Sequence, residues 1–98
     1  MTPKINSVVT GVGKYVPPRI VKNSELEAMM NTSDEWIKQR TGIEERRWAD
    51  PGMSTTSLGY EASLMALKDA GLKPGEIDAI VFATLSPDHF FPGCAVLL

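Results

Sequence analysis

The chain has 98 residues, of which 43% are hydrophobic, and its ten basic and twelve acidic residues give a net charge of -2. This length allows one small domain and excludes two full ones, and the missing basic excess argues against a nucleic-acid partner. A single cysteine excludes an internal disulfide, and the spacings of a structural zinc site are absent. The cysteine usage fits a reducing cytoplasm, and because no run of 18 apolar residues occurs, we expect a soluble protein with no membrane partner.

The first predicted element is a strand over residues 5–16. Valines recur there, and Gly11 and Gly13 indicate a bulge or a close approach of the backbone to another element. Pro17 and Pro18 then fix an extended segment, after which Asn23 is expected to cap a short helix over residues 24–30.

A second short helix is predicted over residues 33–40. Thr32 and Glu35 have the spacing of a capping box, and acidic side chains stand at the positive end of the helix dipole. Gly42 is expected to end this helix, and residues 43–48 then have the pattern of a short strand or hairpin arm.

The longest helix is predicted to follow the turn at Pro51 and Gly52, with hydroxyl caps at residues 54–56 and an end at Gly71. A turn over residues 73–76 leads to the apolar run 79–84, which predicts a strand covered on both faces in a parallel or mixed sheet. After a loop over residues 85–93, residues 94–98 begin a further apolar element. Because the chain stops there, we expect an excerpted chain that forms a single lobe over residues 1–98.

Several residues suggest chemistry but favour a structural role. Gly11 and Gly13 lack the third glycine and the following helix of a dinucleotide fingerprint. His89 has Asp88 beside it, which leaves a proton relay open, although a lone loop histidine is usually solvated. Cys94 lies in a run of small apolar residues, which favours packing over a reactive thiol.

Trp36 and Arg40 are the strongest candidates for a binding site. Their i, i+4 spacing places an indole and a guanidinium side by side on one helix face, where the two can hold an adenine from opposite sides. Composition alone favours an ordinary cation-π pair. Arg46 and Arg47, close behind, either contact phosphate or solvate an exposed strand.

The segment that carries these residues resembles a known family. The run from Asn31 to Ile37, followed by Arg40 to Ile43 and then by Glu45-Arg46-Arg47, is similar to the amino-terminal signature of beta-ketoacyl-acyl-carrier-protein synthase III. The resemblance implies an α/β fold of the thiolase-like type. The chain would be the amino-terminal part of the first mixed-sheet half, in a fold that continues beyond the chain end and works as a homodimer.

The resemblance also implies a substrate site. Thr32, Trp36 and Arg40 match the residues that bind coenzyme A in the family. Phe91 matches the residue that reaches across the dimer and shapes the partner's acyl pocket. The coenzyme A thioester is a substrate there, and we expect neither a separate cofactor nor a metal.

The implied reaction is the decarboxylative condensation of acyl-coenzyme A with malonyl-acyl-carrier protein, which starts fatty-acid synthesis. The family's catalytic cysteine, histidine and asparagine do not fall within this chain, so the chain alone is expected to be inactive. Three alternatives stay open: a condensing enzyme of secondary metabolism, head-to-head condensation of long chains, and a non-catalytic lobe that binds coenzyme A or mediates dimerisation.

Overall fold

The computed structural model describes residues 2–98, which form two compact units. One unit is Val16–Met53, and we call it the α2 unit after its main helix, α2 (Asp34–Thr41). The other combines residues 2–15 with Ser54–Leu98, and we call it the α3 unit after α3 (Thr55–Ala70). The single lobe over residues 1–98 stays a prediction of the sequence.

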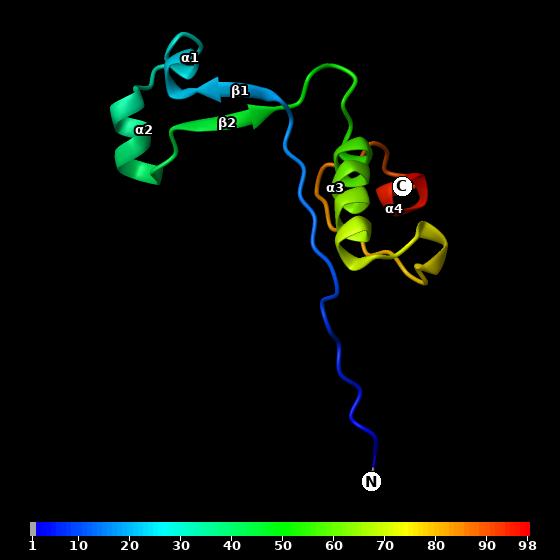
Figure 1. The fold of residues 1–98 in the computed structure, drawn as a ribbon. Helices are drawn as coiled ribbons and strands as arrows, with labels where there is room; N and C mark the ends of the chain where they lie inside the picture. The colour runs from blue at the N-terminus through cyan, green and yellow to red at the C-terminus, as the bar shows by residue number, and fades with distance from the viewer. Residues whose placement is uncertain (1) are drawn as a thin grey trace. The chain divides into compact units, whose positions relative to one another are not determined.

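The α2 unit is built on a two-stranded antiparallel ribbon (Figure 1). Strand β1 (Arg19–Lys22) pairs with β2 (Glu45–Trp48), so that Arg19 lies opposite Trp48 and Lys22 opposite Glu45. Helices α1 (Asn23–Glu27) and α2 are connected in sequence between the two strands. Strand β2 confirms the short strand predicted over residues 43–48, and β1 forms in the segment that follows the two prolines.

The predicted cap of α1 is wrong. Asn23 is the first residue inside the helix, and Lys22 occupies the cap position without a side-chain hydrogen bond. The helix also ends earlier than predicted, at Glu27. The physical reason is that the Asn23 side chain is buried and bonded to other elements, so it does not serve the helix end.

The predicted cap of α2 is displaced by one residue. The Oγ atom of Ser33 accepts a hydrogen bond from the backbone N of Trp36 at 3.1 Å, so Ser33 is the cap and the Thr32–Glu35 capping box is wrong. Gly42 ends the helix as predicted, with a positive φ of 72° that a residue with a side chain rarely adopts.

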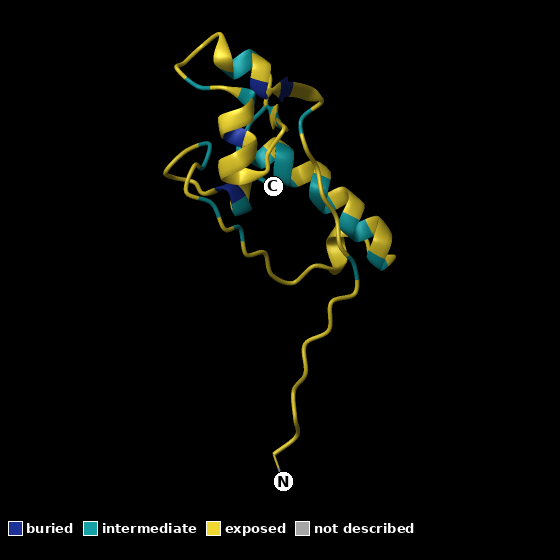
Figure 2. Ribbon diagram, turned by 90° about the vertical axis from the view of Figure 1, so that its left-hand side faces the viewer, coloured by how far each residue is buried: buried dark blue, intermediate teal, exposed yellow. Residues whose placement is uncertain are grey.

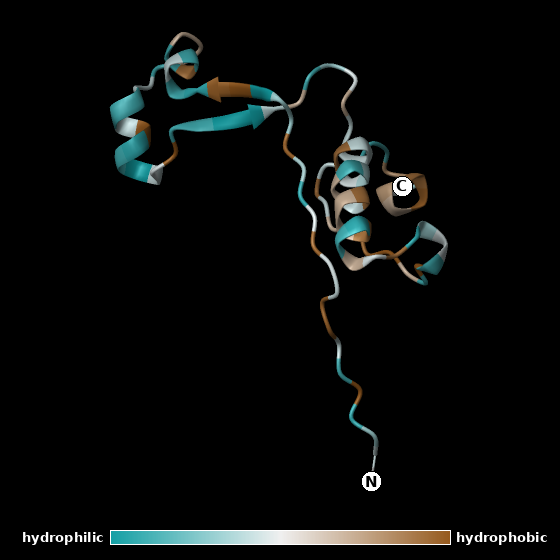
Figure 3. Cartoon of the chain, in the orientation of Figure 1, coloured by the Kyte–Doolittle hydropathy of each residue, from teal (hydrophilic) through white to brown (hydrophobic). Residues whose placement is uncertain are grey.

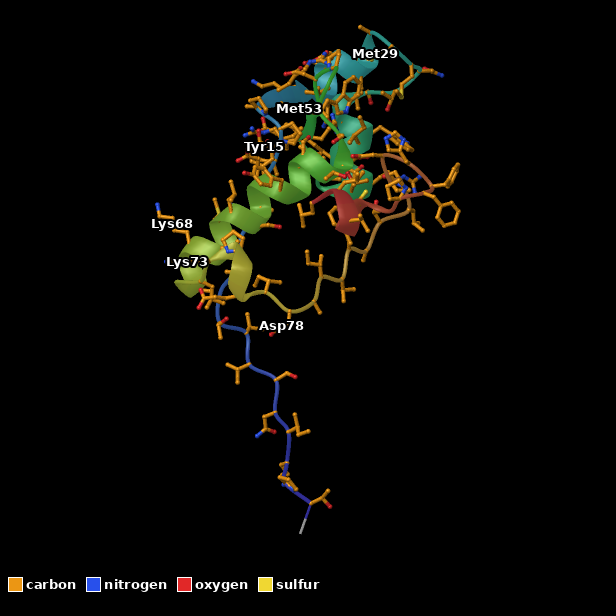
Figure 4. The ribbon with its side chains drawn as sticks, turned by 90° about the vertical axis from the view of Figure 1, so that its right-hand side faces the viewer. Tyr15, Met29, Met53, Lys68, Lys73 and Asp78 are labelled. Atoms are coloured by element: carbon orange, nitrogen blue, oxygen red, sulfur yellow. The ribbon has the colours of Figure 1, made fainter. Side chains whose placement is uncertain are left out.

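Helix α3 confirms the longest predicted helix. Ser54 caps it through a reciprocal pair of hydrogen bonds with Ser57, and Gly71 ends it with a φ of 70°. The chain then turns through the 3-10 helix η1 (Pro74–Glu76), which confirms the turn predicted over residues 73–76. Figure 4 shows Lys68 and Lys73 near this end of α3.

The two early glycines allow the segment around residues 11–13 to lie directly against α3. A Cβ atom at Gly11 would stand 2.5 Å from the carbonyl oxygen of Ala66, and one at Gly13 would stand 2.2 Å from that of Ala62. Both separations are shorter than any van der Waals contact, so only glycine fits. This confirms the close backbone approach and explains both glycines without a nucleotide.

The strands predicted over residues 5–16 and 79–84 are wrong for the described residues. Neither segment forms a ladder within residues 2–98, because β1 and β2 pair only with each other. Most residues of both segments are therefore exposed (Figure 2), and Ile5 and Val81 are 94% and 95% accessible. The end of the chain forms one short helix, α4 (Cys94–Leu97), where a further apolar element was predicted.

Among residues 2–98, no helix combines the length and the apolar composition that are needed to span a bilayer.

Candidate nucleotide-binding site

Helix α2 presents an aromatic ring and a guanidinium as neighbours. The Cζ atom of Arg40 lies 5.8 Å from the centroid of the Trp36 ring, and 55% of Trp36 is exposed. Within residues 2–98 the structure shows no hydrogen bond or ion pair that holds the Arg40 guanidinium. The predicted side-by-side arrangement is confirmed, and the pair keeps both groups available to a planar ligand.

A surface hollow adjoins this pair. It has a volume of about 280 Å³ and is lined by Asn31, Thr32, Ser33 and Trp36. Because Ser33 caps the helix, the hydroxyl of Thr32 is not needed there. The structure thus brings Thr32 and Trp36 to one hollow and places Arg40 beside Trp36. We call Thr32, Trp36 and Arg40 the α2 surface.

The hydrophobic contact that anchors α2 is small. Ile37 is its one buried residue, and Figure 3 shows a helix that is hydrophilic around most of its circumference. Burying one isoleucine contributes about 1.5–3 kcal/mol, which does not fix the rotation of an eight-residue helix. Polar contacts at the helix ends must therefore set its orientation.

One of those contacts is at the first residue of the helix. The carboxylate of Asp34 accepts a hydrogen bond from Asn23 Nδ2 at 2.8 Å and forms an ion pair with Lys38, with 3.1 Å between Lys38 Nζ and Asp34 Oδ2. The hydrogen bond from Asn23 and the interaction with Lys38 lower the pKa of Asp34 below its ordinary value of 3.8. Asp34 is thus ionised at neutral pH, at the helix end that favours negative charge.

Sequence reasoning did not find the role of Asn23. Only 1% of this residue is exposed, and its amide joins the carboxylate of Asp34, the carbonyl oxygen of Ile43 and the guanidinium of Arg46. The only sequence signal was an asparagine next to a predicted helix, which a cap explains equally well.

Arg46 and Arg47 hold the ribbon together. Arg46 donates to the carbonyl oxygen of Val21 at 3.2 Å and to Asn23 Oδ1 at 2.6 Å, and Arg47 donates to the carbonyl oxygen of Pro17 at 3.0 Å. Both guanidinium groups thus have partners inside the α2 unit. These contacts favour a structural role over the phosphate contacts that the sequence left open.

The remaining candidates lie in the α3 unit. Phe91 is 93% exposed, and His89 is exposed on the same loop. The carboxylate of Asp88 accepts a hydrogen bond from the backbone N of Thr56 at the start of α3, which argues against its orienting His89 in a proton relay. Only 3% of Cys94 is accessible, as the packing interpretation predicted.

No family model matches the chain. It is 50% identical over all 98 residues to beta-ketoacyl-[acyl-carrier-protein] synthase III of Caldanaerobacter subterraneus subsp. tengcongensis, of which it covers 30%. It is 53% identical over 92 residues to the protein of the same name from Allorhizobium ampelinum, and this match includes 94% of the chain and 28% of the relative.

Solved structures give a parallel result. The chain superimposes on 3-oxoacyl-[acyl-carrier-protein] synthase III from Aquifex aeolicus with a TM-score of 0.85 and 44% identity, covering 90% of the chain and 28% of that structure. The corresponding enzyme from Thermus thermophilus matches with a TM-score of 0.83 and 41% identity, over 93% of the chain and 28% of that structure.

These matches show that the chain has part of a thiolase-like fold, as the resemblance implied. Among proteins of this fold, the chain is similar to the amino-terminal part of the beta-ketoacyl-[acyl-carrier-protein] synthases III. It spans about 30% of the length of the curated relatives that it matches.

Proposed function

We propose that the chain forms part of a 3-oxoacyl-acyl-carrier-protein synthase III that condenses acyl-coenzyme A with malonyl-acyl-carrier protein at the start of fatty-acid synthesis. The observation that carries this proposal is the 50% identity to a relative of that name over all 98 residues. The free aromatic and guanidinium groups of α2 support it independently, because they suit the adenine of coenzyme A.

In this proposal the α2 surface binds the nucleotide end of the thioester. Trp36 stacks on the adenine, Arg40 covers its other face, and Thr32 contacts the nucleotide from the adjoining hollow. A base held between two planar groups needs about 3.5 Å on each side, or about 7 Å in all. Arg40 stands 5.8 Å from the Trp36 ring centroid, so its guanidinium withdraws by at least about 1 Å when the base enters.

The chemistry itself belongs to residues outside this chain. A cysteine thiolate takes the acyl group and releases coenzyme A; the malonyl group then loses carbon dioxide, and the carbanion attacks the acyl thioester. A histidine and an asparagine stabilise the developing negative charge. Cys94 does not suit the first role, because it is buried in α4. The chain alone is therefore expected to bind but not to turn over.

The proposal extends to the assembly of the enzyme. We place the protein in the cytoplasm as a homodimer that needs no cofactor beyond its thioester substrate. Phe91, which is 93% exposed on its loop, is available to reach a second copy and shape that copy's acyl pocket.

The test of the activity is a turnover assay of the full-length protein with acyl-coenzyme A and malonyl-acyl-carrier protein. The proposal predicts equal amounts of 3-oxoacyl-acyl-carrier protein, carbon dioxide and free coenzyme A. Binding of coenzyme A without any product would contradict it and would favour the non-catalytic lobe.

A second candidate is a starter step of secondary metabolism. The chain is 37% identical, with a TM-score of 0.74, to a structure described as the priming beta-ketosynthase from the R1128 polyketide biosynthetic pathway. The same assay separates the two candidates when acetyl, branched and medium-chain thioesters are compared, because the two kinds of enzyme differ in the acyl group that they accept.

A further inference from the structure

The buried amide of Asn23 is the most connected side chain of the α2 unit. Its Nδ2 atom donates to Asp34 Oδ1 and to the carbonyl oxygen of Ile43, both at 2.8 Å, and its Oδ1 atom accepts from Arg46 Nη2 at 2.6 Å. The two acceptors and the guanidinium admit only one orientation of the amide. If the amide were flipped, its NH2 group would face the guanidinium donors of Arg46, and its oxygen would face the two acceptors. The side chain is therefore fixed by its partners.

These partners belong to both ends of α2. Asp34 is the first residue of the helix, and Ile43 follows the Gly42 that ends it. A single side chain thus contacts the helix start and the residue just beyond the helix end. The backbone N of Asn23 adds a hydrogen bond to the carbonyl oxygen of Glu44 at 3.2 Å, which holds the same segment against α1.

The other side of the amide is tied to the ribbon. Arg46 in β2 donates to Asn23 and, through its second terminal nitrogen, to the carbonyl oxygen of Val21 in β1. Asn23 thereby connects α2 to both strands. It also stands between the negative charge of Asp34 and the positive charge of Arg46, so each buried polar atom faces a complementary one.

The α2 surface depends on this connection. Trp36 is two residues from Asp34, and Arg40 is two residues from Gly42, so a small rotation of α2 moves both groups together. Because Ile37 is the one buried residue of the helix, its packing opposes such a rotation only weakly. We infer that Asn23 is a positioning residue for the α2 surface, which it holds through Asp34, Ile43 and Arg46; this inference rests on the proposed binding of coenzyme A by α2.

The test uses the full-length protein and compares Asn23→Ala with Val21→Ala. Val21 is fully buried in the same unit but is not bonded to α2 through its side chain, so its truncation controls for a general loss of stability. We expect Asn23→Ala to raise the KM for acyl-coenzyme A about tenfold, while kcat at saturation changes less than about twofold. Val21→Ala should leave the KM near its wild-type value. An equal KM in the two variants would overturn the inference.

A second pair of variants keeps the test decisive if Asn23→Ala does not fold. Asn23→Asp retains the acceptor for Arg46 but loses both donors and places a carboxylate against Asp34. Adding Asp34→Asn restores one hydrogen bond with donor and acceptor exchanged. We expect the double variant to recover a lower KM than Asn23→Asp alone, and no recovery would overturn the inference.

The proposed function is tested separately by Trp36→Ala. If that variant leaves the KM unchanged, the α2 surface does not bind coenzyme A and the proposed function of α2 fails. If Trp36→Ala raises the KM and Asn23→Ala does not, only the positioning role fails.

Discussion

The α2 unit contains two pairs of the same chemistry in different surroundings. Arg40 lies 5.8 Å from the ring centroid of Trp36 on one exposed helix, whereas Arg19 lies 5.1 Å from that of Trp48 across the β1–β2 ribbon. Arg19 is also paired with Glu25, and Trp48 is half-buried. The comparison teaches that a cation-π contact alone does not define a site; what matters is whether the two groups have other partners.

The largest expected effect concerns binding. Stacking of a base on an aromatic side chain contributes about 1–3 kcal/mol, so Trp36→Ala should raise the KM for acyl-coenzyme A about 5- to 150-fold. Steady-state kinetics of the full-length protein measures this, with Trp48→Ala as the matched control. A comparable rise in the control would remove the distinction between the two pairs.

The free energy of unfolding should depend more on Trp48 than on Trp36, which is the reverse of their order for the KM. Trp48 packs across the ribbon, so Trp48→Ala should lower the free energy of unfolding by about 2 kcal/mol. Trp36→Ala, at a site that is 55% exposed, should lower it by less than about 0.5 kcal/mol. Denaturant unfolding of the two variants measures the difference, and equal losses would contradict the assignment of Trp48 as the structural tryptophan.

Arg40 and Arg19 should also differ in their effect on coenzyme A affinity. Arg40→Lys keeps the charge but removes the planar group that covers the base, so coenzyme A affinity should fall by about 1 kcal/mol, or about fivefold. Arg19→Lys should leave the affinity unchanged, because Arg19 is engaged by Trp48 and Glu25. Calorimetric titration with coenzyme A distinguishes the two; equal affinities would show that Arg40 contributes only charge.

Acid should weaken the stabilisation that Asp34 gives to α2, the helix that carries Trp36 and Arg40. The pKa of Asp34 lies below 3.8 in the folded protein, so the stabilisation that Asp34 provides is complete above about pH 4 and is lost as the pH falls through the lower folded-state value. In Asn23→Ala the pKa of Asp34 should rise toward its ordinary value, because the largest cause of the shift is removed. Carboxyl chemical shifts followed against pH measure this, and an unchanged pKa would show that Lys38 alone is responsible.

The smallest effect is expected from the ion pair beside Trp48. Both side chains of the Arg19–Glu25 pair are partly exposed, so Glu25→Gln should change stability by at most about 1 kcal/mol, and less at high salt. Thermal unfolding at two salt concentrations measures it. A larger loss would mean that Glu25 fixes the ribbon rather than only Arg19.

Local signals predicted much of this fold and of the candidate site. Ser54 and Gly71 bound α3 as expected because capping depends on residues within one turn of the helix end. The contact between Trp36 and Arg40 followed from helical spacing alone. The cap of α2 was displaced from Thr32 to Ser33, because adjacent hydroxyl residues offer the same local signal.

What the sequence did not predict depends on distant partners. The three side-chain hydrogen bonds of Asn23 reach residues 11 to 23 positions away. Nothing near Asn23 in sequence therefore distinguishes a buried residue that connects several elements from a helix cap. The strands over residues 5–16 and 79–84 have suitable composition, but a strand exists only where another strand pairs with it. The described residues supply a partner only for β1 and β2.

Whether Trp36 rather than Trp48 contacts the nucleotide can be measured by a coenzyme A titration of the full-length protein labelled with 5-fluorotryptophan. Fluorine resonances are assigned with Trp36→Phe and Trp48→Phe, so each pair is observed separately in one sample. We expect coenzyme A to shift the Trp36 resonance and to leave that of Trp48 in place. Saturating binding that leaves the Trp36 resonance unmoved would contradict this expectation.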